Sequence, residues 1–175
     1  MTTLNEYLAE KRAAIEARMA DVAAGKERAT TLTARVSASG RSGIRRIRIR
    51  DFQVISDSDL DFAGYNLGPS SPELQMGVLG SCITHTFLIQ AALMGVPLDS
   101  VETEVNCTVD VRAGSPGFEN VPFPPHDIRY AVAIKSPAPQ AEIDKLHEAV
   151  SNNCPILSLL RSPQAIAGEV RLTRA

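Results

Sequence analysis

The pattern of apolar and polar positions divides the chain into helical and extended segments. Apolar residues recurring at three, four and seven positions predict amphipathic helices over residues 3–24 and 139–152. A proline at the start of the segment 154–160 is typical of a further short helix. Because the helix over 3–24 has a single apolar stripe, we expect it to pack on its own domain or on a partner chain.

Alternation of apolar and polar residues with a period of two predicts the strands. Most of these runs are separated by stretches rich in Gly, Ser, Asp or Pro, which favour turns and loops. The expected strands, in chain order, are 32–38, 44–50, 52–55, 101–111, 128–134 and 166–172.

The longest predicted helix spans residues 71–95 and is apolar nearly all round. Ser71 and Pro72 suit its start, and Gly95 suits its end. Such a helix lies in a protein core or in a membrane, and the polar residues that interrupt it favour the core. The order of elements predicts an α+β fold, with an antiparallel-rich sheet wrapped around this central helix. We expect two parts, an N-terminal helical appendage at 1–28 and one domain at 29–175.

The amino-acid composition excludes several classes of function. The 175 residues are 44% hydrophobic and 22% charged, as in an ordinary globular protein. The net charge of −2 and the absence of Trp argue against a nucleic-acid or membrane partner. An arginine-rich run at 41–50 is therefore interpreted as a solvated strand face. The first twenty residues lack the apolar core of a signal peptide, so we expect a cytoplasmic protein whose three cysteines are thiols.

Cys82 is the first candidate for chemistry, because it lies on the predicted central helix after two glycines, Gly77 and Gly80. Glycine is unfavourable inside a helix, so these two predict the close approach of another backbone or of a substrate. His85 lies three residues later on the same face, where an imidazole can lower the pKa of the thiol or accept its proton. The alternatives are an inert buried cysteine and a core histidine.

Cys154 is the second candidate. It precedes Pro155 at a predicted helix start, where free N–H groups and the helix dipole favour a thiolate; the alternative is a cysteine that only caps the helix. Cys107 lies in mid-strand and is expected to be structural. A zinc site of Cys82, His85 and Cys154 lacks an evident fourth ligand, so we expect no bound metal.

Taken together, these residues resemble the OsmC/Ohr family of organic hydroperoxide reductases. The stretches that carry the resemblance are ProGluLeu…LeuGlySerCys at 72–82, GlyValProLeuAspSerValGluThrGluVal at 95–105 and AsnAsnCysProIleLeuSerLeuLeuArg at 152–161. Their order and spacing extend the resemblance over residues 30–174.

The resemblance implies that Cys82 attacks a hydroperoxide and becomes a sulfenic acid, and that Cys154 resolves this as a disulfide. An external dithiol, such as a dihydrolipoyl group, would reopen the disulfide, and no cofactor is implied. The family also uses an arginine, placed here at Arg41, and a glutamate at the start of the central helix. In the family the carboxylate of that glutamate holds the arginine. Counting back from Cys82 places the glutamate at Pro72, and Glu73, one residue closer, is the candidate for its catalytic role here.

The resemblance further implies an intertwined homodimer with active sites at the subunit interface, so that Arg41 can reach Cys82 from the partner chain. A second interpretation is a protein of this fold that binds a small apolar ligand at the dimer interface without turnover. The displacement of Glu73 favours that alternative, and the presence of both cysteines favours the peroxidase.

Overall fold

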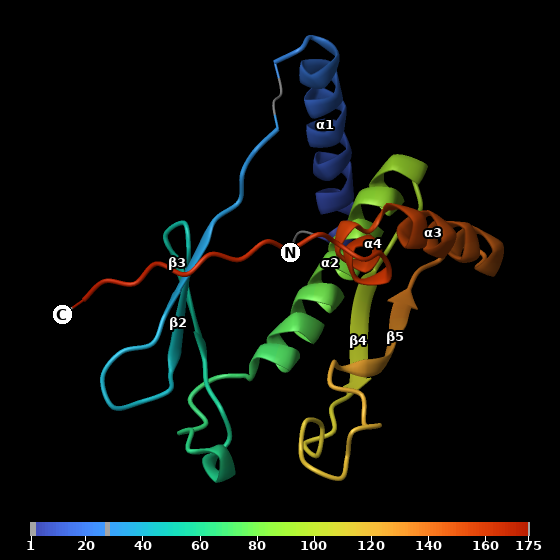
Figure 1. Cartoon of the computed structure of the whole chain (residues 1–175). Helices are drawn as coiled ribbons and strands as arrows, with labels where there is room; N and C mark the ends of the chain where they lie inside the picture. Colours follow the sequence, from blue (N-terminus) through green and yellow to red (C-terminus); the bar gives the residue numbers. More distant parts are fainter. Residues whose placement is uncertain (1–2, 27–28, 175) are drawn as a thin grey trace.

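The computed structural model describes residues 3–26 and 29–174 (Figure 1). Its helices are α1 (Leu4–Ala23), α2 (Ser71–Met94), α3 (Gln140–Asn153) and α4 (Pro155–Arg161), with a short 3-10 helix at Leu60–Phe62. Its strands are β1 (Ala34–Ser37), β2 (Arg45–Ile49), β3 (Phe52–Ser56), β4 (Ser100–Thr108) and β5 (His126–Lys135). The predicted α+β class is confirmed.

Helix α2 is the central element, since α1, α3, α4 and β4 all contact it (Figure 1). Ser70 caps its start, Pro72 lies in its first turn, and Gly95 ends it with φ 72°, a conformation that favours glycine. By length and composition α2 would suit a membrane span. Its packing on three helices and a strand is instead that of a core helix.

The hydrophobic core forms along α2. Leu79, Ile83 and Phe87 are almost fully buried and belong to one cluster with side chains from the other helices. The partners of this cluster from α1, α3 and α4 and from the segment after α2 are Leu8, Val96, Leu98, Leu146, Val150, Cys154 and Leu157. The inward residues of β4 and β5, among them Val101, Val105, Tyr130, Val132 and Ile134, pack against it.

The strands form two antiparallel sheets. β4 pairs with β5, and β4 packs on α2, so this pair supplies the sheet that covers the central helix. β1, β2 and β3 form a separate three-stranded sheet, which Figure 1 shows away from the α2 bundle.

The three-stranded sheet has one apolar face and one cationic face. The strand register places Val36, Ile47 and Val54 side by side on the apolar face, with Ile49 and Phe52 next to them. Val36 is 59% exposed and Phe52 is 63% exposed, so within the described residues nothing covers this face. The opposite face carries Arg35, Ser37, Arg46, Arg48 and Gln53.

The strand predicted at 166–172 is wrong. Residues 163–174 form neither helix nor strand, and Ile166, Val170 and Leu172 are each more than four-fifths exposed. A strand forms only where an edge offers backbone groups for pairing, and this segment meets no such edge within the described part of the chain.

Helix α1 packs into the same core as the rest of the chain. Leu8 is only 6% exposed, while Leu4 and Ile15 pack against the core cluster. The Asn5 side chain also accepts a hydrogen bond of 2.9 Å from the backbone N–H of Leu98, which joins the two segments. The boundary predicted at residue 28 falls on residues outside those described and stays a prediction.

We expect Leu8→Ala to lower the free energy of unfolding by about 2–4 kcal/mol, because it removes a buried side chain and leaves a cavity. Met19→Ala on the same helix is the matched control, since Met19 is 62% exposed. Denaturant unfolding measures both variants. Equal stabilities of the Leu8 and Met19 variants would contradict the packing of α1 described above.

Candidate active site

Cys82 and Cys154, which lie 72 residues apart in the sequence, meet in space. The thiol of Cys154 donates a hydrogen bond to Sγ of Cys82, with 3.5 Å between the sulfurs, and both cysteines are free thiols. Helix α2 positions Cys82, and the junction of α3 with α4 positions Cys154. Since a disulfide is about 2.05 Å long, the two sulfurs need to move about 1.5 Å closer to bond.

The two thiols differ in their access to solvent. Cys154 is 1% exposed and belongs to the hydrophobic core, whereas Cys82 is half-buried. Cys82 lines a groove of 550 Å³ beside α2, together with Leu74, Val78, His85 and Ile156. A small molecule therefore reaches the sulfur of Cys82 first.

Burial raises the pKa of the Cys82 thiol, and a hydrogen bond from the backbone N–H of Ile156 opposes that shift. Ile156 lies in the first turn of α4, so the helix start predicted to serve Cys154 directs this donor at Cys82. The neighbouring Cys154 thiol, whose ionised form would repel a charge on Cys82, raises the pKa of Cys82 further. The described residues thus favour a neutral thiol at rest, and an added positive charge is needed for a thiolate.

The two glycines before Cys82 serve different purposes. A Cβ on Gly80 would lie 3.3 Å from the Val105 side chain, so Gly80 lets α2 approach β4 closely, as predicted. A Cβ on Gly77 would meet nothing within 4 Å, and Gly77 lines the groove beside Cys82. Gly77 therefore leaves space for a ligand or a partner chain.

Glu73 caps helix α2. The backbone N–H and the hydroxyl of Ser70 both donate to Oε2 of Glu73, each at 2.7 Å. These bonds lower the pKa of Glu73, so its carboxylate is charged. Glu73 lines the same groove as Cys82. Its role in catalysis stays a prediction.

His85 contacts a lysine of helix α1. Nζ of Lys11, from α1, lies 2.9 Å from Nε2 of His85. Loss of solvent around the imidazole, with the nearby Lys11 charge, lowers the pKa of His85. The imidazole is therefore neutral near neutral pH and lies at the edge of the groove that contains Cys82.

Lys11 lies on the inward stripe of α1, between Leu8 and Ile15 at helical spacing. Lys11 occupies a position where the helical repeat calls for an apolar residue. This departure from the repeat is the sequence signal by which Lys11 could have been found.

Arg41 is the predicted site residue that the structure does not bring to Cys82 within the chain. It lies in the turn between β1 and β2, is exposed, and does not line the groove. Figure 1 shows this turn away from α2.

A larger cavity of 710 Å³ lies between α2 and β4 and contains Cys107 rather than Cys82. Cys107 is free and half-buried. In residues 3–26 and 29–174 no three His, Cys, Asp or Glu side chains are grouped so as to hold a metal ion. His85, considered above as a zinc ligand, has its Nε2 in contact with Lys11 instead.

The family model described as OsmC-like protein matches residues 64–167. The fold is similar to that of an OsmC-like protein from Mycoplasma pneumoniae, at 18% identity and TM-score 0.61, over 77% of this chain and 89% of that one. It is also similar to an organic hydroperoxide resistance protein from Elizabethkingia anophelis, at 15% identity and TM-score 0.56, over 77% and 91%.

A third structure of similar fold is an organic hydroperoxide resistance protein OsmC from Legionella pneumophila, at 15% identity and TM-score 0.54, over 77% and 92%. None of the curated proteins matches the chain. At these identities the structural likeness concerns the fold alone.

We expect Ser70→Ala to lower the free energy of unfolding by about 1 kcal/mol through loss of the cap. Glu73→Gln should also destabilise the protein at neutral pH. Because the pKa of Glu73 is lowered in the folded protein, its negative charge stabilises the fold above the ordinary carboxyl pKa. This stabilisation is lost as the pH falls through the lowered pKa of the folded state.

The difference between wild type and Glu73→Gln should therefore vanish in acid, as measured by denaturant unfolding at several pH values. Glu10→Gln, a change at an exposed position of α1, is the control. A loss of stability in Glu73→Gln that stays constant down to acidic pH would contradict the stabilisation of α2 by a charged Glu73 carboxylate.

Proposed function

The chain belongs to the OsmC-like protein family, and from this premise we propose that it reduces organic hydroperoxides with Cys82 and Cys154. The observation that carries the proposal is the pair of free thiols 3.5 Å apart, one of them lining an open groove. Relatives of similar fold are named organic hydroperoxide resistance proteins, which supports the same substrate class.

Cys82 is the attacking thiol because it is the sulfur that lines the groove. Its thiolate attacks the distal oxygen of ROOH, so that an S–O bond forms and the O–O bond breaks. The sulfur is oxidised to a sulfenic acid, and the peroxide is reduced to an alkoxide that takes up a proton to give ROH. The largely apolar groove, with Leu74, Val78 and Ile156, suits an organic R group.

Cys154 then resolves the sulfenic acid. Its sulfur attacks Sγ of Cys82, an S–S bond forms, and hydroxide leaves with the thiol proton of Cys154 as water. The buried position of Cys154 protects it from direct oxidation, and its 3.5 Å separation from Cys82 requires only a small movement. An external dithiol, of the dihydrolipoyl kind, returns both cysteines to thiols.

A second copy of the chain completes the site in this proposal. Burial holds the pKa of Cys82 up, and within one chain Arg41 lies in a turn that does not reach the groove. The apolar face of the β1–β3 sheet, defined by Val36, Ile47, Ile49, Phe52 and Val54, is open to solvent in the single chain. We propose that a partner covers this face and that the Arg41 turn of each chain lies at the groove of the other.

The second candidate is a protein that binds a small apolar ligand without turnover. The observation that favours it is the use of the Glu73 carboxylate in capping α2, which leaves one oxygen fewer to hold an arginine. The approach of the two thiols favours the peroxidase.

We expect Cys82→Ser to abolish consumption of cumene hydroperoxide by the reduced protein. Cys154→Ser should allow one turnover and then accumulate the Cys82 sulfenic acid, because the resolving thiol is missing. Hydroperoxide loss and dimedone labelling measure these outcomes, and Cys107→Ser serves as the matched cysteine control. Equal, slow consumption by wild type and Cys82→Ser would favour the ligand-binding protein.

Because Arg41 acts on the Cys82 of the partner chain in this proposal, two inactive variants should complement each other. Cys82→Ser and Arg41→Ala homodimers should each be inactive or nearly so. With random mixing, half of the dimers contain one subunit of each variant. Each of these mixed dimers has one site that joins an intact Cys82 to an intact Arg41, so about a quarter of wild-type activity should return.

The mixture is made by co-refolding the two variants and is assayed for hydroperoxide consumption. If the mixture is no more active than the sum of its parts while wild type refolds to full activity, Arg41 does not act across subunits.

A further inference from the structure

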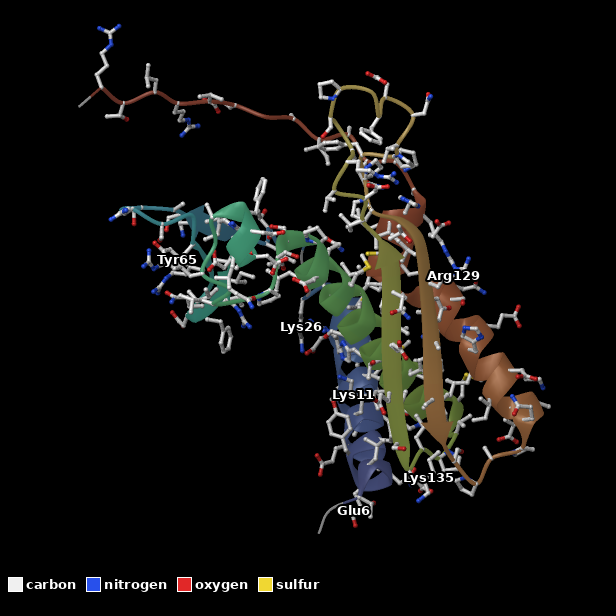
Figure 2. The ribbon with its side chains drawn as sticks, turned by 90° about the horizontal axis from the view of Figure 1, so that it is seen from below. Glu6, Lys11, Lys26, Tyr65, Arg129 and Lys135 are labelled. Carbon is white, nitrogen blue, oxygen red and sulfur yellow. The ribbon has the colours of Figure 1, made fainter. Side chains whose placement is uncertain are left out.

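Lys11 lies at a position where the helix repeat calls for an apolar residue. Leu4, Leu8, Lys11 and Ile15 follow one another at spacings of four, three and four, and the three apolar members pack into or against the core. Lys11, labelled on α1 in Figure 2, is itself half-buried, and its ammonium lies 2.9 Å from Nε2 of His85 on α2. Helix α1 thus delivers a cation to the face of α2 that contains Cys82.

The contact defines which nitrogen of His85 carries the proton. An ammonium has only donors, so Nε2 of His85 accepts the hydrogen bond of 2.9 Å from Lys11. A neutral imidazole then carries its proton on Nδ1. In this form His85 is a hydrogen-bond donor with no free acceptor nitrogen, and it cannot take the thiol proton of Cys82.

The reaction needs a proton at the leaving oxygen. Among the residues lining the groove, the titratable ones are Glu73, Cys82 and His85. Glu73 is a charged carboxylate held by Ser70, and Cys82 is the nucleophile. His85 is the remaining group of the groove that can supply a proton.

We propose that His85 donates the proton to the alkoxide released from the hydroperoxide, and that Lys11 is the positioning residue that fixes its tautomer and restores its proton. The inference rests on the proposed function of Cys82. Nδ1–H of His85 protonates RO⁻ to ROH while Lys11 passes a proton to Nε2. The neutral amine regains a proton from solvent, and the imidazole returns to its Nδ1–H form by giving up the Nε2 proton and taking one at Nδ1 from solvent. No electrons move in this step, and no further reactant is needed.

The charged and titratable groups around His85 come from three elements. Lys11 faces it from α1, Glu73 and Cys82 share its groove on α2, and Cys154 lies behind Cys82 at the start of α4. Lys11 is the cation among them, so its removal should affect the proton supply without altering the thiol pair.

The test compares two oxidants that differ in how much they need a proton at the leaving oxygen. Cumene hydroperoxide releases a strongly basic alkoxide, whereas peroxyacetic acid releases the weakly basic acetate. The rate of Cys82 oxidation by each is measured in a single turnover, in a Cys107→Ser background. Lys11→Met and His85→Phe are the test variants. Arg12→Met is the matched control, because Arg12 is the next residue, half exposed and paired with Glu16.

General acid catalysis typically contributes 10²–10⁴-fold to a rate. We therefore expect His85→Phe to slow the oxidation of Cys82 by cumene hydroperoxide by roughly 100-fold, and Lys11→Met to slow it by about 10-fold. Both variants should react with peroxyacetic acid within about twofold of wild type, and Arg12→Met should be normal with both oxidants.

Equal slowing with both oxidants would show that the pair only supports the structure, and unchanged rates with cumene hydroperoxide would exclude a proton donor; either result overturns the inference. If Cys82 of the wild type reacts with neither oxidant, the proposed function itself fails.

Discussion

The burial of α2 is the constraint on which the rest of the structure depends. The helix is apolar on nearly all sides, so it is stable only when other elements cover it. The helices that cover it also supply parts of the candidate site: α1 brings Lys11, the α3–α4 junction brings Cys154, and α4 directs the Ile156 N–H at Cys82. The packing that buries α2 therefore also assembles the candidate site.

The same burial creates the electrostatic difficulty of the site. Removing solvent from Cys82 raises the pKa of its thiol, while the proposed reaction needs the thiolate. Within the described residues the compensation comes from the backbone N–H of Ile156 and the Thr86 side chain, and not from an arginine. The uncovered apolar face of the β1–β3 sheet and the exposed turn at Arg41 agree with a site completed by a second copy.

Much of the fold followed from local signals. Pro72 and Gly95 located the ends of α2, although its N-cap is Ser70 and not the predicted Ser71, and alternation located β4 and β5 within a few residues. The segment 166–172 has the same alternation but pairs with no strand in the described part of the chain, and alternation alone does not identify a partner strand. The approach of Cys154 to Cys82 entered through family resemblance. Lys11 could have been noticed as a cation in the apolar stripe of α1, but its contact with His85 depends on how two helices pack, which the sequence pattern does not contain.

The most direct test of the central claim is peptide mapping and intact mass after the reduced protein meets one equivalent of cumene hydroperoxide. The account predicts a loss of about 2 Da and a crosslink that joins the Cys82 and Cys154 peptides. An unchanged mass, or a crosslink through Cys107, would contradict it.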